Sequence, residues 1–232
     1  MTATARFLAR AMRSPTGAIG LILMLVPVMA MLAAATLTLP NPLIPNISAR
    51  LAPPTIGWSG LGAHPLGTDQ LGRDILSRVL HATRTTLGIS LASVALGGVL
   101  GVVIGLVSGY KGGMLDRILM RVVDIQLALP LLLLALMVIA VLGPSVVNVV
   151  VVLALTGWIP FARVTRAQVL SLKERDFILS ARVIGTNAFD IMTRNILPNV
   201  ASPLLVVATL EFARIILLES ALGFLGLGVQ PP

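Results

Sequence analysis

Three charged residues in the last apolar run of the sequence could act inside a membrane protein: Glu211, Arg214 and Glu219. A charge at bilayer depth costs at least roughly 2.5 kcal/mol, so such groups usually pair or face a polar interior. Glu211 and Arg214 are three residues apart and can pair on one helix face, whereas Glu219 lies about 140° round the helix from Arg214. Two interpretations stay open: the three residues line a translocation path, or they form an intrahelical pair and a glutamate at the membrane interface.

Catalytic chemistry is largely excluded by what the sequence lacks. It contains no cysteine and no G-x-x-x-x-G-K-[ST] stretch that could cradle a phosphate; GLVSGYKGG has the wrong spacing and no hydroxyl after its lysine. The two histidines, His64 and His81, lie outside the apolar runs at a separation that is not a metal-ligand spacing. We therefore predict no catalytic residue, no metal site, no bound cofactor and no ATP hydrolysis by this chain itself.

The composition indicates the medium in which the chain works. Hydrophobic residues make up 56% of its 232 positions and charged residues only 11%, and the mean hydropathy is +0.98, well outside the range of soluble domains. The net charge of +8 would suit a nucleic-acid partner, but in a membrane chain the position of each charge matters more than the sum. We expect an integral membrane protein surrounded by membrane lipid, with no nucleic-acid partner.

Five apolar runs approach the ~20 residues that a helix needs to cross about 30 Å of hydrocarbon. They lack the alternation of a barrel strand, so the predicted fold class is an all-α integral membrane bundle. The first run, which contains Pro27, is interpreted as an uncleaved anchor rather than a signal peptide. The five predicted spans are roughly Ala18–Leu39, Leu87–Tyr110, Val122–Leu142, Ser145–Phe161 and Val200–Leu225.

Lysine and arginine residues predict the orientation of these spans. A cytoplasmic N-terminus, which holds Arg6, Arg10 and Arg13, places twelve basic residues in inside segments and four in one long outside loop, as the positive-inside rule requires. The predicted organisation is a cytoplasmic N-terminus (1–17), an anchor helix (18–39), an extracytoplasmic loop (40–86) and a membrane core (87–232).

The outer loop changes character along its length. Its prolines keep the first part irregular, and from Asp69 onward the pattern is helical, with Thr68 or Asp69 as the expected N-cap and a pair between Asp74 and Arg78. An interfacial helix leading into the second span explains this better than a metal site at Asp69 and Asp74.

The second span carries glycine at every fourth position, namely Gly97, Gly101, Gly105 and Gly109. Such a stripe lets the backbone of another helix approach closely, and in lipid this close packing drives helix association. Because glycine is also simply common in membrane helices, the alternative is that the stripe has no special role. We favour a packed helix interface.

The stretch Phe177–Asn199 is polar, yet it lies between two apolar runs. Apolar residues at helical spacing precede Gly185, which we expect to end a helix as a C-cap does, and Asn187 is expected to cap a second short helix that Pro198 stops before the final span. A helix–turn–helix of this kind is most economically a docking site for a soluble partner. The alternative is a helix pair that lies on the lipid headgroups, attracted by its arginines.

Four stretches carry a resemblance to a known family. Within residues 171–199, Ser180 and Ala181 are followed by Gly185 and the closing Leu197-Pro198; the others are HPLGTDQLGRDILSR (64–78), GYKGGMLDRILMRVVDIQLALP (109–130) and ALGFLGLGVQPP (221–232). Together they resemble the permease subunits of ABC importers in the dipeptide, oligopeptide and nickel branch, specifically the second of two paired permeases. Residues 171–199 are similar to the EAA loop of that family, with Ser180 and Ala181 at its two alanine positions.

The resemblance implies a membrane subunit of an ATP-driven importer for peptides or related small solutes, including nickel, in a bacterial inner membrane. It implies three kinds of partner: a second homologous permease, one or two cytoplasmic ATPases that bind ATP and Mg, and an extracytoplasmic substrate-binding protein. In such importers the EAA loop forms a coupling helix that seats in the ATPase. The coupling residues implied in this way are Ser180, Ala181, Gly185, Thr186, Asn187, Asp190, Leu197 and Pro198.

Two features depart from the family pattern. Leu179 stands where the EAA motif has its glutamate, so an ion pair from that position to the ATPase is not expected. The family also continues past the Gln-Pro-Pro at 230–232 to a sixth helix, so we expect the chain to be truncated before its last helix. The alternative functions are a gradient-driven secondary transporter or channel, and a non-transporting membrane scaffold.

Overall fold

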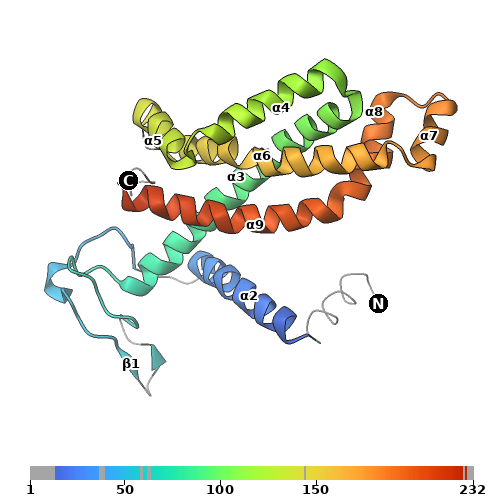
Figure 1. The fold of residues 1–232 in the computed structure, drawn as a ribbon. Helices are drawn as coiled ribbons and strands as arrows, with labels where there is room; N and C mark the ends of the chain where they lie inside the picture. The colour runs from blue at the N-terminus through green and yellow to red at the C-terminus, as the bar shows by residue number, and fades with distance from the viewer. Residues whose placement is uncertain are drawn as a thin grey trace. The chain divides into compact units, whose positions relative to one another are not determined.

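The computed structural model of this chain describes residues 14–36, 40–57, 60–61, 64–143, 145–226 and 228. It forms two compact units, Met1–Leu87 and Gly88–Pro232, and helix α3 (Ile75–Lys111) contributes to both (Figure 1). The arginines that were predicted to make the N-terminus cytoplasmic and the closing Gln-Pro-Pro lie outside the described residues.

Over its described residues before α3, the first unit contains one apolar helix followed by a mostly irregular segment. The predicted anchor is helical: α2 runs over Pro15–Thr36 and continues through Pro27. It is followed by a single 3-10 turn, η1 (Ile47–Ala49), and by a short antiparallel ribbon that pairs β1 (Ile56–Gly57) with β2 (Gly60–Leu61).

The N-terminus of α3 is capped by Asp74, whose carboxylate accepts a hydrogen bond from the Ser77 N–H at 2.7 Å. The prediction of Thr68 or Asp69 as the N-cap is therefore wrong. The predicted pair between Asp74 and Arg78 is also wrong, because the Arg78 guanidinium pairs with Asp69 at 2.6 Å.

Asp69 instead organises the turn that precedes the helix. Gly72 has a φ of +73°, a left-handed conformation that interrupts any helix at this point. The Asp69 carboxylate accepts hydrogen bonds from the N–H groups of Leu71 and Arg73 and pairs with Arg73 Nε at 2.8 Å. Burial disfavours the charged carboxylate, but the hydrogen bonds from Arg73 outweigh it and lower the pKa of Asp69 to about 2.

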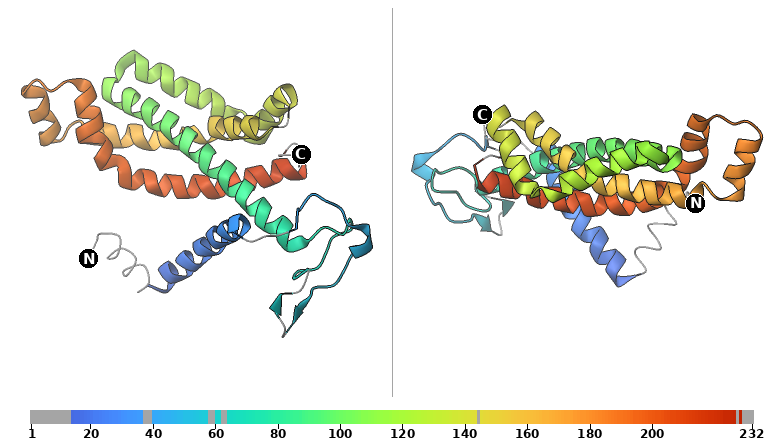
Figure 2. Two further views of the ribbon diagram at one scale, coloured as in Figure 1. Left: turned by 180° about the vertical axis from the view of Figure 1, so that it is seen from behind. Right: turned by 45° about the horizontal axis from the view of Figure 1, so that its top comes forward.

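The second unit consists, over its described residues, of helices and the turns that join them. Its helices α6 and α9 run side by side in both views of Figure 2. This architecture confirms the predicted all-α fold class. Beyond α3, the elements are α4 (Gly113–Ala128), α5 (Leu131–Leu142), α6 (Val146–Leu172), α7 (Asp176–Val183), α8 (Ala188–Asp190), the π-helix η2 (Ile191–Ile196) and α9 (Leu197–Phe224).

Within the described residues, three helical stretches are long and apolar enough to cross a membrane: Ile75–Lys111, Val146–Leu172 and Ala188–Phe224. A fourth is present if α4 and α5 are counted together as one bent span. In α2 the apolar stretch that the structure describes, Gly17–Ala33, is shorter than these. The helices fit a multi-pass membrane protein, while the number of five spans stays a prediction.

The third predicted span, Val122–Leu142, is not one straight helix. Helix α4 begins much earlier, at Gly113, and the chain bends by 89° between α4 and α5. Proline disfavours helical geometry in the residue before it, and Leu129, which precedes Pro130, is extended with φ −88° and ψ 131°. The apolar run Val122–Leu142 is long enough for one membrane span, so its length did not indicate the break at Pro130.

The second, fourth and fifth predicted spans are longer than predicted, and the helix of the second runs over Ile75–Lys111. Helix α6 starts after Ser145, whose hydroxyl accepts a hydrogen bond from the Asn148 N–H at 3.1 Å, and it continues past Phe161. The prediction that Pro198 stops the chain before the final span is wrong, since α8, η2 and α9 form one helical stretch. Pro198 is the second residue of α9, directly after the π-helix η2.

The four glycines of the stripe in α3 lie against the backbone of α6. A Cβ atom would lie 2.9 Å from a backbone oxygen if added at Gly97 and 2.5 Å from one at Gly105. At Gly109 it would lie 2.8 Å from a side-chain carbon, and at Gly101 it would overlap a backbone oxygen. Contact this close between two helices leaves no room for any side chain on this face of α3.

We expect Gly101→Ala to weaken the contact between α3 and α6, and Gly98→Ala to leave it intact. A methyl group at position 101 would overlap the Trp158 carbonyl oxygen and lie 2.7 Å from Phe161 Cβ, whereas at position 98 it would lie 3.5 Å from the Phe161 ring, an ordinary contact. Overpacking of this kind costs about 1–3 kcal/mol. Thermal unfolding of the purified variants in detergent measures the effect, and equal midpoints for the two variants would contradict this packing.

Candidate functional site

The helix–turn–helix segment, residues 176–196, lies at one end of the second unit, away from α5 (Figure 1). Helix α7 ends at Val183, and Gly185, which has a φ of +87°, closes its C-terminus as predicted. The Gly185 N–H donates to the Arg182 carbonyl and the Thr186 N–H donates to the Ala181 carbonyl, each at 3.0 Å. These two bonds make a Schellman motif, and they satisfy the carbonyl groups that the helix end leaves open.

Asn187 caps the next turn of helix, as predicted. Its side-chain oxygen accepts a hydrogen bond from the Asp190 N–H at 2.8 Å, and its amide nitrogen donates to the Asp190 carboxylate at 2.8 Å. Asp190 also lies 3.3 Å from Arg194, which is largely exposed. The turn from Gly185 to Asp190 is therefore held by local hydrogen bonds, to which the pair of Asp190 with the exposed Arg194 is added.

The inner face of the segment is anchored in an apolar cluster. Ile178, Ile191 and Ile196 are completely buried, and they pack with Leu106 of α3 and Val169 of α6. Partly buried residues extend the cluster, and they include two of the predicted coupling residues, Ala181 and Leu197. The segment is therefore attached to the ends of three membrane helices.

An aromatic contact adds to this anchor. The Arg182 guanidinium lies 5.0 Å from the centre of the Tyr110 ring, near the C-terminus of α3, within the range of a cation–π interaction. Arg182 thus joins α7 to α3, although no pattern in the sequence indicated that these two residues would meet.

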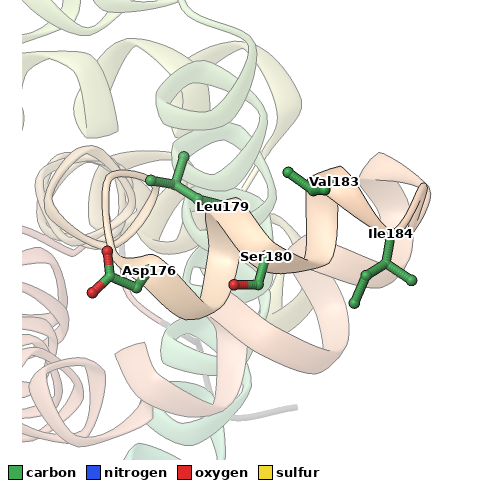
Figure 3. A pocket seen from close by; sticks show the side chains of 5 residues that line it. All are labelled: Asp176, Leu179, Ser180, Val183 and Ile184. Carbon is green, nitrogen blue, oxygen red and sulfur yellow. The ribbon is translucent and has the colours of Figure 1, made fainter.

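The outer face of α7 forms a groove of about 320 Å³. Figure 3 shows the five side chains that line it, all from α7 and its C-terminal end: Asp176, Leu179, Ser180, Val183 and Ile184. Their spacing of three or four residues places them along one side of the helix. Apart from one carboxylate and one hydroxyl, the groove is apolar.

The predicted coupling residues occupy different positions around this segment. Ser180 lines the groove, Gly185 and Thr186 form the turn, and Asn187 and Asp190 hold the next helical turn. Leu197 and the exposed Pro198 do not lie in the turn but begin α9.

The charged residues of the last span lie on α9. Arg214 and Glu211 pair at 2.7 Å, with the Glu211 side chain almost completely buried, and Glu219 is partly buried. The guanidinium of Arg214 also donates to the carbonyl of Thr156 in α6 at 3.2 Å. The pair thus touches a neighbouring helix, and the assignment of these three residues to a translocation path stays a prediction.

Sequence reasoning missed a polar cluster that joins α3, α4 and α6. Arg166 pairs with Asp116 at 2.5 and 2.6 Å, and the Ser108 hydroxyl donates to the same carboxylate. In the same way, Gln126 accepts a hydrogen bond from the Trp158 indole N–H at 3.0 Å. These partners are far apart in the chain, so only knowledge of which helices are neighbours could have revealed them.

Within the described residues, no group of three or more His, Cys, Asp or Glu side chains could hold a metal ion. The segment combines an apolar groove on its outer face with an inner face that is anchored in the apolar cluster.

Comparison with known proteins identifies the family. Residues 101–232 match the family described as binding-protein-dependent transport system inner membrane component. This match bears out the resemblance to ABC importer permeases, so the chain is a transport subunit and not an enzyme.

Three relatives are permease proteins of peptide transport systems. The di/tripeptide transport system permease protein DppC of Pseudomonas aeruginosa is 42% identical over 182 residues, which is 78% of this chain and 60% of the relative. The dipeptide transport system permease protein DppC is 39% identical over 92% of this chain in Haemophilus influenzae and 43% identical over 95% of it in Escherichia coli. This chain spans 60% of the length of the first relative and 72% and 73% of the other two.

The family match over more than half of the chain and the identity to these relatives agree. This chain belongs to the inner membrane components of binding-protein-dependent transport systems.

Proposed function

We propose that this chain is one of two paired permeases in an ATP-driven importer of dipeptides or oligopeptides. The importer lies in a bacterial inner membrane, with the N-terminus of this chain in the cytoplasm. The names of the relatives support a di- or tripeptide cargo, and nickel complexes are the other cargo class that the resemblance allows. The partners are a second permease, one or two ATPases that bind ATP and Mg²⁺, and an extracytoplasmic binding protein.

We assign docking of the ATPase to the outer face of the helix–turn–helix segment. The observation that carries this assignment is the contrast between its two faces. On the outside, Val183 is 88% exposed, Ile184 82% and Leu179 44%, whereas the inner face is fixed to α3, α6 and α9 by buried isoleucines. A segment that is apolar on its outer face and anchored on its inner face transmits movement of its partner to the membrane helices.

The chemistry of the groove indicates what the ATPase presents to it. Leu179 replaces the glutamate of the family motif, so docking at this position gains from burial of apolar surface rather than from an ion pair. The matching surface of the ATPase is therefore apolar. Asp176 and Ser180, the two polar residues that line the groove, supply the polar contacts.

Replacing Gly185 tests the turn. A proline cannot adopt a φ of +87°, whereas asparagine tolerates the left-handed region. A Cβ at this position would meet no atom within 4 Å, so steric overlap is not at stake. Proline would also remove the N–H that donates to the Arg182 carbonyl. We expect Gly185→Pro to lower ATP-driven dipeptide uptake in proteoliposomes of the complete transporter at least about tenfold, with normal membrane insertion.

Gly185→Asn is the matched control and should retain most of the uptake. Equal uptake by the proline variant and the unmodified protein would show that this turn does not couple the ATPase to the membrane helices. Uptake that needs an ion gradient instead of ATP would favour a secondary transporter, and the absence of any uptake with a fully assembled complex would favour a scaffold.

A lysine at Leu179 should weaken binding of the ATPase, and a lysine at Phe177 should not. The two side chains lie on the same helix and have almost equal exposure, 44% and 45%, but only Leu179 lines the groove. A charge placed against an apolar partner surface loses hydration without gaining a partner, so we expect about tenfold or weaker affinity for Leu179→Lys.

The affinity of the detergent-solubilised permease pair for the ATPase subunit measures this difference. Equal weakening by both variants would show that the groove is not the docking surface. If neither variant has an effect, the segment lies on the lipid headgroups instead.

A further inference from the structure

Pro160 leaves a backbone carbonyl without its usual donor inside a membrane helix. It lies in the interior of α6, and proline has no N–H to donate to the carbonyl four residues earlier. That carbonyl belongs to Thr156, which is buried. In the hydrocarbon region water does not replace a missing donor, so the protein itself must supply one.

Arg214 of α9 supplies this donor. Its Nη2 donates to the Thr156 carbonyl at 3.2 Å, and its Nε donates to the Glu211 carboxylate at 3.0 Å. The Glu211 side chain is only 8% exposed. Its carboxylate therefore balances the charge of the Arg214 guanidinium inside the contact between α6 and α9. The Thr156 hydroxyl is engaged separately, with the carbonyl of Leu153.

A glycine in α6 lets α9 approach closely beside the contact between Arg214 and Thr156. Gly157 follows Thr156, and a Cβ atom at this position would lie 3.3 Å from Ile215 Cδ1 and 3.7 Å from the Glu211 carboxylate. The Ile215 side chain is completely buried. Because α6 carries glycine here, α9 comes close enough for Arg214 to reach the backbone of α6.

We infer that Arg214 replaces, from α9, the hydrogen bond that Pro160 removes from α6, and that Glu211 holds Arg214 in place. Arg214 is then a positioning residue that sets the register of α6 against α9. This role requires neither cargo nor ATPase, so it does not depend on the proposed importer function.

The test is whether the charged pair becomes dispensable when residue 160 regains an N–H. Removing Arg214 alone would strand the buried Glu211 carboxylate whatever occupies position 160. Both charges are therefore removed together in Glu211→Leu/Arg214→Met, once in the natural Pro160 background and once with Pro160→Ala. Each protein is purified as the whole transporter in mild detergent, and its thermal unfolding is followed.

We expect the uncharged pair to lower the ratio of folded to unfolded protein about tenfold in the natural background, as for loss of one buried hydrogen bond. When Pro160→Ala is also present, most of that loss should disappear. Pro203→Ala is the matched control, since Pro203 also lies inside a membrane helix but its missing donor is unrelated to Thr156. If the uncharged pair does not fold in the natural background, recovery of folded protein by Pro160→Ala supports the inference equally.

An equal loss with and without Pro160→Ala, or equal rescue by Pro203→Ala, would overturn the inference. Peptide uptake gives a second reading. Residues that contact cargo would raise the half-saturating peptide concentration whatever residue occupies position 160. A positioning role instead predicts that Pro160→Ala restores the maximal rate, with half-saturation unchanged.

Discussion

In a bilayer each backbone carbonyl needs a donor from the protein itself, and the prolines of this chain show three ways of meeting that requirement. At Pro130 the helix simply stops and the chain turns by 89°. Directly before Pro198 the helix changes to the π-helix η2, where the Leu197 N–H donates to the Met192 carbonyl five residues earlier. At Pro160 the helix continues and a side chain from α9 donates to the open carbonyl.

Lipid removes most of the hydrophobic drive that joins helices in water, so contact depends on close packing and polar bonds. The glycine stripe of α3 provides the close packing against α6. Polar side chains then fasten α6 to its other neighbours, with Asp116 and Gln126 reaching it from α4 and Arg214 from α9. Helix α6 is thus the helix that α3, α4 and α9 all contact.

The sequence allowed prediction of those features that depend on neighbours along the chain. Apolar length predicted helices, and the spacing of Gly185 and Asn187 predicted a capped turn, because both follow from local geometry. The bend at Pro130 was missed because mean hydropathy, taken over a window of residues, does not change when the helix breaks within that window. The pairing of Asp116 with Arg166 was missed for a different reason: the two residues are fifty positions apart, and only the packing of α4 against α6 brings them together.

The π-helix η2 also sets the rotation of α8 relative to α9 about the helix axis. A π-turn holds about one residue more than an α-turn, and each α-helical residue turns the chain by about 100°. The side chains of α8 and those of α9 therefore cannot be placed on one helical wheel. The direction in which α7 and α8 face, relative to the side chains of α9, is therefore set by one surplus residue between Ile191 and Ile196.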